Sequence, residues 1–184
     1  MPVETPICDF GKKALPFELK STDNKIISLN DFKGENGTLI MFICNHCPYV
    51  KAITKDITDD CNELKKIGIN SVAICSNDQI NYPEDSFDNM IKFSKDNRFS
   101  FPYLQDKTQE IAKAYDAVCT PDFFGYNKNL ELQYRGRIRE LKNLLPVREG
   151  DSDLLKAMKH IAKTDIGPQD QIPSAGCGIK WKYN

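Results

Sequence analysis

The sequence predicts an α/β fold in which helices cover both faces of one mixed β-sheet, and two observations support this. Two runs, Thr38–Cys44 and Ile69–Cys75, are apolar at nearly every position, which is typical of strands buried on both faces. An amphipathic segment follows each run, first Tyr49–Lys66 and then Pro83–Asn97. This strand, helix, strand, helix order indicates a parallel pair of strands joined by right-handed crossovers.

Shorter elements complete the predicted sheet on either side of this unit. Before it, two alternating segments surround a polar turn and predict an N-terminal β-hairpin extension. After it, the pattern predicts a short strand, a short helix, a second hairpin and a last amphipathic helix capped by acidic and hydroxyl residues. In chain order these segments are Phe17–Lys20, Ile26–Leu29, Phe101–Leu104, Thr108–Ala117, Asp122–Tyr126, Leu130–Arg135 and the helix from Asp151 to Thr164.

Length and charge limit the classes of protein that this chain can represent. The 184 residues predict a single domain over 1–184, with a core over about 10–165 and a Gly- and Pro-rich tail over 166–184. The net charge is -1, from 25 Lys and Arg against 26 Asp and Glu. This balance offers no electrostatic surface for nucleic acid or for an anionic membrane.

The sequence gives no sign of targeting to a membrane. Its longest apolar run, Thr38–Cys44, is far shorter than the ~20 residues that span a bilayer. The first ten residues contain Glu4 and Asp9 and lack an apolar core. We therefore expect a cytoplasmic protein, in which the seven cysteines are mostly reduced thiols and not a disulfide framework.

The chemistry is concentrated at the end of the first central strand, in Cys44-Asn45-His46-Cys47-Pro48-Tyr49-Val50. Pro48 suits the first turn of the helix that follows, which leaves Cys47 at its N-cap. A thiol there faces unpaired backbone N–H groups and the positive end of the helix dipole, and both favour the thiolate. Cys47 is therefore the predicted nucleophile, and the neighbouring His46 could lower its pKa further.

The remaining cysteines and the second histidine have simpler interpretations. Cys61 and Cys75 lie on predicted buried faces and are therefore expected to be core residues. Cys8 precedes the predicted elements and reads as a surface thiol, whereas Cys119 could be either a core or a site residue. His160 lies among lysines of the last helix and is predicted to be exposed.

Several motifs resemble the thioredoxin superfamily, and specifically its peroxiredoxin-like (AhpC/TSA-type) branch. The segment Leu39–Leu64 is similar to the nucleophile region of those proteins, with Cys47 as the attacking cysteine. The segment Val118-Cys119-Thr120-Pro121 resembles the Thr-Pro that faces that sulfur through a cis proline. The resemblance covers about residues 10–165 and implies a thioredoxin-like fold, with Pro48, Tyr49, Thr120 and Pro121 beside the substrate.

Three motifs together resemble one subfamily of peroxiredoxin-like proteins. They are Cys44–Val50, Tyr134-Arg135-Gly136-Arg137 and Pro173-Ser174-Ala175-Gly176-Cys177-Gly178-Ile179-Lys180-Trp181. The resemblance implies a thiol-dependent redox protein without a cofactor, acting on a peroxide or a disulfide. A thiol such as thioredoxin or glutathione would donate the electrons, and a homodimer is compatible with it.

The sequence also departs from the patterns of these families. Val50 replaces the second cysteine of thioredoxins, and Cys44 and Ile40 replace the Thr and Pro that precede the peroxiredoxin cysteine. The usual peroxidase arginine is missing from its place, although Arg135 and Arg137 on the next strand could reach the site. Either thiol–disulfide exchange or peroxide reduction therefore stays open.

Two cysteines could resolve an oxidised Cys47. Cys44 is three residues away and is favoured because closing a short loop costs less entropy. Cys177 is the alternative, carried by the tail. Ile179 and Trp181 are expected to dock that tail on the body of the protein. A redox role for Cys47 requires its sulfur to be open to solvent and close to Pro121.

Two other classes of function compete with redox chemistry. Cys44, His46 and Cys47 could form a soft site for copper or zinc, although Lys51 occupies the position of the last cysteine in copper-delivery relatives. The chain could also be a non-catalytic interaction module. An apolar pocket could be walled by the aromatic residues near the site, which are also expected in the core: Tyr49, Phe123, Phe124 and Tyr126.

Overall fold

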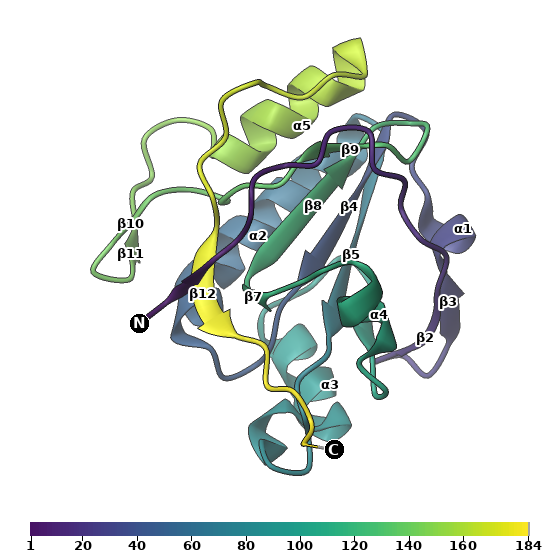
Figure 1. The fold of residues 1–184 in the computed structure, drawn as a ribbon, viewed down its shortest axis with the longest axis vertical. Helices are drawn as coiled ribbons and strands as arrows, with labels where there is room; N and C mark the ends of the chain where they lie inside the picture. Colours follow the sequence, from purple (N-terminus) through teal and green to yellow (C-terminus); the bar gives the residue numbers. More distant parts are fainter. Residues whose placement is uncertain (184) are drawn as a thin grey trace.

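A seven-stranded mixed sheet forms the centre of the computed structural model, which describes residues 1–183 (Figure 1). Its strands are β2 (Glu18–Ser21), β3 (Ile26–Ser28), β4 (Gly37–Phe42), β5 (Ile69–Cys75), β6 (Tyr103–Gln105), β8 (Asp122–Tyr126) and β9 (Leu132–Tyr134). Their order is β3-β2-β6-β5-β4-β8-β9. β5 runs parallel to both β4 and β6, and the other pairs are antiparallel. The predicted mixed sheet is confirmed.

Helices cover both faces of this sheet, as the doubly apolar strands predict. The helices are α1 (Leu29–Phe32), α2 (Pro48–Lys66), the 3-10 helix η1 (Pro83–Asp85), α3 (Phe87–Asp96), α4 (Glu110–Ala114) and α5 (Asp153–Thr164). Side chains alternate along β4, so that Leu39 and Met41 pack with α2, α3 and α5. Ile40 and Phe42 pack on the opposite face with α1 and α4. The apolar run of β4 therefore serves two separate cores.

Helix α2 begins where the sequence places it. Pro48 is its first residue and Cys47 its N-cap. Its apolar positions face the core and are buried: Val50, Ile53, Ile57, Cys61 and Leu64. The predicted helix over Pro83–Asn97 is divided at Ser86, whose side chain caps α3 by accepting from the Asn89 N–H.

The C-terminal tail is part of the folded structure and was the least predictable segment. Its strand β12 (Ala175–Gly178) lies between β1 (Val3–Glu4) and β7 (Cys119–Thr120) in a separate three-stranded sheet. Figure 1 shows β12, in yellow, crossing beside the purple N-terminal strand. The register sets Cys177 opposite Thr120 and Gly178 opposite Cys119. This sheet was not predicted from the sequence, and neither was a small hairpin of β10 (Leu141–Lys142) and β11 (Leu145–Pro146).

Glycine at position 176 permits this close approach. A Cβ atom there would lie 1.9 Å from the carbonyl oxygen of Thr120, well inside van der Waals contact. Of the two tail residues expected to dock on the body, Ile179 is buried and Trp181 is 37 % exposed. Its indole lies beside the Lys113 ammonium, 5.8 Å from the ring centre, and not in the core.

The burial of the other singled-out residues follows their positions in the sheet. Cys61 and Cys75 are buried as predicted, and Cys119 is buried as well. Cys8 is partly buried, because it packs against the core on the α1 and α4 face, so the expectation of a surface thiol is wrong. The aromatic residues of β8 are core residues: Phe123, Phe124 and Tyr126. None of the helices in residues 1–183 is long and apolar enough to cross a membrane.

Candidate active site: a thiol cluster at the start of helix α2

Cys47 lies where the carboxyl end of β4 leads into α2, opposite the turn that contains Pro121. The Thr120–Pro121 peptide bond is cis. The Cys47 sulfur lies 3.2 Å from the carbonyl oxygen of Thr120, to which it donates when protonated. The sulfur is therefore close to Pro121, as the redox interpretation requires.

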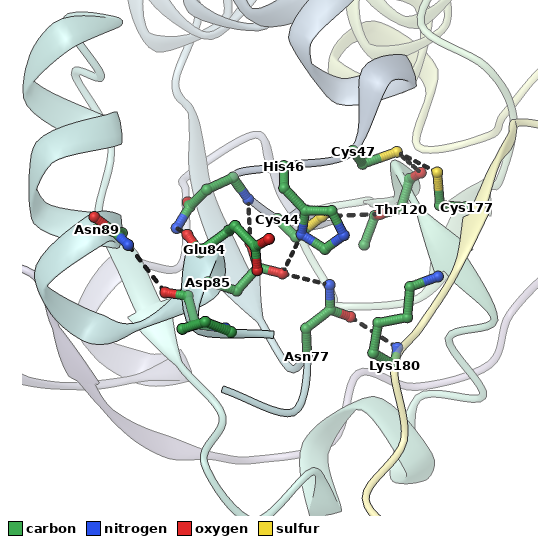
Figure 2. A network of polar contacts seen from close by, with 12 residues as sticks. Cys44, His46, Cys47, Asn77, Glu84, Asp85, Asn89, Thr120, Cys177 and Lys180 are labelled. Carbon is green, nitrogen blue, oxygen red and sulfur yellow. Dashed lines mark hydrogen bonds and ion pairs between the residues drawn. The ribbon is translucent and has the colours of Figure 1, made fainter. Parts of the chain in front are cut away.

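The second requirement, access to solvent, is not met in this conformation. Cys47 has 0 % of its surface exposed. The tail covers it, with the Cys177 sulfur 3.0 Å from the Cys47 sulfur (Figure 2). The expectation of an open Cys47 was wrong because the tail, which was expected to dock on the body, docks directly over this sulfur. Cys177 itself is partly exposed.

Cys44 acts on Cys47 as a hydrogen-bond donor. Its sulfur lies 3.4 Å from the Thr120 hydroxyl, which can donate to it. The Cys44 thiol in turn donates to the Cys47 thiolate, and this contact and burial raise the pKa of Cys44. A buried cysteine held as a thiol is a poor nucleophile. Cys44 is therefore a hydrogen-bond donor to Cys47. Cys177, which was the less favoured candidate for the resolving thiol, is the cysteine whose sulfur contacts that of Cys47.

The surroundings of Cys47 lower its pKa to about 4. The Cys44 thiol is the largest cause, and burial opposes it. Three further donors favour the anion: the Cys177 thiol and the backbone N–H groups of Val50 and Cys177. The Cys47 side chain nevertheless forms no capping hydrogen bond at the start of α2. The Thr120 carbonyl favours the protonated form, but it is one acceptor against several donors. The donors decide the balance, and Cys47 is a thiolate at neutral pH.

Cys177 has the opposite tendency. Burial, followed by its hydrogen bond to Cys47, raises the pKa of Cys177 to about 11. The two sulfurs in contact therefore form an unequal pair, in which Cys47 holds the negative charge and Cys177 the proton.

His46 pairs with a residue that sequence reasoning missed. Its Nδ1 lies 2.6 Å from a carboxylate oxygen of Asp85, which is fully buried. Asp85 also accepts from the backbone N–H of Asn45 at 2.7 Å and from the side-chain amide of Asn77 at 2.8 Å. Asp85 lies in the segment Pro83–Asn97, which was predicted only as an amphipathic helix. The largest causes of the fall in the Cys47 pKa do not include His46.

The ligand set expected for a metal is arranged differently from the prediction. Cys44, His46 and Asp85 have potential ligand atoms within 4.8 Å of one another, whereas Cys47 is outside this group. Three N–H donors already engage the Asp85 oxygens. This geometry is that of a hydrogen-bonded His–Asp pair.

The two arginines that could have served a peroxidase each form an ion pair, and Arg137 also lines the cavity that contains Tyr49 and Pro121. Arg135 is buried and forms a two-pronged ion pair with Asp122, at 3.2 and 2.9 Å. The Nε of Arg137 donates to Asp153 at 2.7 Å. The Tyr-Arg-Gly-Arg motif therefore ties β9 to β8 and to the start of α5.

The residues expected beside the substrate lie in the first turn of α2 and in the turn that contains Pro121. Pro48 is exposed and Tyr49 half-buried in the first turn of α2. Tyr49 and Pro121 line a cavity of about 240 Å³ next to the tail. Thr120 is buried and touches both Cys44 and Cys47. The four residues are therefore gathered around the start of α2.

The model of the AhpC/TSA family matches residues 10–141 of this chain. The chain belongs to the AhpC/TSA family. Among solved structures, an uncharacterized conserved protein from Geobacillus kaustophilus is 40% identical, with a TM-score of 0.90 and coverage of 100% of this chain and 98% of that one. A hypothetical protein from Sinorhizobium meliloti 1021 is 33% identical, with a TM-score of 0.89 and 98% coverage of both chains. No curated protein matches the sequence.

More distant structures place this AhpC/TSA protein in the thioredoxin-like fold. Peroxidoxin BcpB from Mycobacterium tuberculosis is 14% identical, with a TM-score of 0.58 over 83% of this chain and 92% of that one. The thioredoxin domain of a thiol-disulfide oxidoreductase from Bacteroides vulgatus is 15% identical, with a TM-score of 0.59 over 74% and 91%. Family and fold together support a thiol-redox function in general.

Proposed function

We propose that this protein is a thiol–disulfide oxidoreductase that cycles between the Cys47 and Cys177 thiols and a disulfide between them. The contact of 3.0 Å between the two sulfurs carries the proposal. A thiolate attacks disulfides, and Cys47 is the cysteine whose environment favours that form.

The reaction runs in two exchanges. The Cys47 thiolate attacks one sulfur of a substrate disulfide, so that a mixed disulfide forms and one substrate thiolate leaves. Cys177 gives its proton to that leaving thiolate and then attacks the Cys47 sulfur. The second substrate sulfur departs as a thiolate, and a Cys47–Cys177 disulfide remains. The substrate gains two electrons and the two cysteines lose them.

The tail must move for the first exchange, because Cys47 is fully covered. Only two residue pairs join β12 to β7. Opening there would expose Cys47, and closing would return Cys177 to contact. The tail is thus both the cover of the nucleophile and the carrier of the resolving thiol.

A disulfide fits this site better than a peroxide as the oxidant. Peroxide reduction profits from a cation that stabilises the leaving oxygen. Arg135 and Arg137 are instead held by Asp122 and Asp153. Peroxide reduction and binding without catalysis are therefore the two alternatives to disulfide exchange that an oxidation experiment must distinguish.

The test oxidises the reduced protein with either oxidised glutathione or hydrogen peroxide and maps the products by mass spectrometry. We expect a Cys47–Cys177 disulfide, formed faster with the disulfide reagent, and a mixed disulfide at Cys47 in Cys177→Ser. Cys119→Ser is the matched control, because this buried neighbour contacts neither sulfur in the proposed reaction. Faster oxidation by peroxide would indicate a peroxidase. If Cys47 is unreactive in Cys177→Ser at pH 8, the proposed redox function is wrong and a non-catalytic interaction module is favoured instead.

A further inference from the structure

The segment after β5 connects the tail to the His46–Asp85 pair through one side chain. Asn77 is 5 % exposed. Its amide nitrogen donates to Asp85 Oδ2 at 2.8 Å, and its amide oxygen accepts from the backbone N–H of Lys180 at 2.9 Å. Figure 2 shows this side chain between the carboxylate and the tail strand.

Lys180 is one of the points at which the tail is held by several hydrogen bonds. Besides the bond to Asn77, its carbonyl oxygen accepts from the N–H of Asp78 at 2.8 Å and from the side chain of Gln109 at 2.8 Å. Lys180 is three residues beyond Cys177, so its position sets the register in which Cys177 meets Thr120. Displacement by one residue would point Cys177 away from Cys47.

Asparagine is well suited to this place because a single amide offers both a donor and an acceptor. The buried carboxylate of Asp85 is stabilised by hydrogen-bond donors, and Asn77 adds one to those from Asn45 and His46. The backbone N–H of Lys180 in turn requires an acceptor. A carboxylate at position 77 could satisfy the tail but would face Asp85 with like charge.

We propose that Asn77 is a positioning residue that holds the C-terminal strand in the register bringing Cys177 to Cys47, and that it ties this closed position to the His46–Asp85 pair. The inference rests on the proposed function for its role in disulfide formation. The geometry of the closed tail stands independently of that function. Asn77 acts through the tail and the carboxylate and touches neither sulfur.

The experiment compares Asn77→Ala, Asn77→Asp and Asn81→Ala in the full chain. Asn81 is the matched control, since this exposed residue of the same segment donates only to Asp78. Two quantities are measured: the equilibrium between Cys47–Cys177 disulfide and thiols in glutathione buffers, and the rate of Cys47 alkylation by iodoacetamide in reduced protein. Alkylation of Cys61, buried in the core, reports general loosening of the fold.

We expect both Asn77 variants to disfavour the disulfide by about tenfold or more and to speed alkylation of Cys47 by a similar factor. Asn77→Ala loses the hydrogen bonds to both Asp85 and Lys180. Asn81→Ala and the alkylation of Cys61 should not change. Asn77→Asp is informative because it keeps the acceptor for Lys180 and replaces the donor to Asp85 with a like charge.

Three results would overturn the proposal. The first is wild-type behaviour of Asn77→Ala. The second is wild-type behaviour of Asn77→Asp, which would show that the hydrogen bond to Asp85 does not help to hold the tail. The third is a rise in Cys61 reactivity together with that of Cys47, which would indicate general loosening of the fold. If wild type forms no Cys47–Cys177 disulfide, the proposed function fails. The alkylation rates then still decide whether Asn77 holds the tail closed.

Discussion

Replacing Cys44 tests the origin of the Cys47 thiolate. The donor thiol of Cys44 is the largest cause of the fall in the Cys47 pKa from the ordinary 9.0 to about 4. A hydrogen bond to a charged group contributes ~1.5–3 kcal/mol, which corresponds to a pKa change of about one to two. Cys44→Ala should therefore raise the pKa of Cys47 by about one to two. Cys44→Ser keeps a donor in the same place and should leave it nearly unchanged.

The thiolate absorbance near 240 nm, followed between pH 3 and 9, measures this pKa. Cys47→Ser provides the blank. The other cysteines do not interfere below pH 8, because their pKa values are raised: Cys8, Cys44, Cys61, Cys75, Cys119 and Cys177. An unchanged midpoint in Cys44→Ala, or equal shifts in the Ala and Ser variants, would refute the donor role of Cys44.

Three further predictions concern the tail, the pH dependence and the arginine of the Tyr-Arg-Gly-Arg motif. Gly176→Ala should push β12 away and speed the alkylation of Cys47 by about tenfold or more; Gly178→Ala should not, because its Cβ would meet only an ordinary contact at 3.6 Å. The folded pKa of Cys47 is depressed. Its contribution to the free energy of unfolding is therefore full above about pH 9 and is lost as the pH falls towards 4; urea titrations of reduced wild type and Cys47→Ser should converge over this range. Arg135→Met should lower the free energy of unfolding by about 3–5 kcal/mol, because it leaves the buried Asp122 carboxylate unpaired; the same protein should keep the Cys47 midpoint in the 240 nm titration, and a shifted midpoint would place Arg135 in the site.

The local part of the fold could be predicted because its signals lie within single segments. Ile69–Cys75 is apolar on both faces and forms a strand with those bounds. Pro48 marks the first turn of α2, and Cys47 is its N-cap. The cis bond before Pro121 followed from the resemblance and is present.

The remaining features depend on contacts between distant segments. Asp85 meets His46 across 39 positions, and Cys177 meets Cys47 across 130. Nothing local to the tail marks Cys177 as a neighbour of α2, and the loop-closure argument favoured the closer Cys44. Chain entropy was outweighed here by specific pairing: two strand pairs, the close approach at Gly176 and the bonds to Lys180.

The closed tail also bears on oxidative damage to the protein. A cysteine that has taken up one oxygen is lost to sulfinic acid only if a second oxidant molecule arrives before a thiol does. At Cys47 that thiol lies next to the sulfur, and the approach from solvent is closed in the same arrangement. The protein should therefore survive repeated exposure to strong oxidants with its nucleophile intact, whereas a chain lacking the Cys177 sulfur would be inactivated irreversibly.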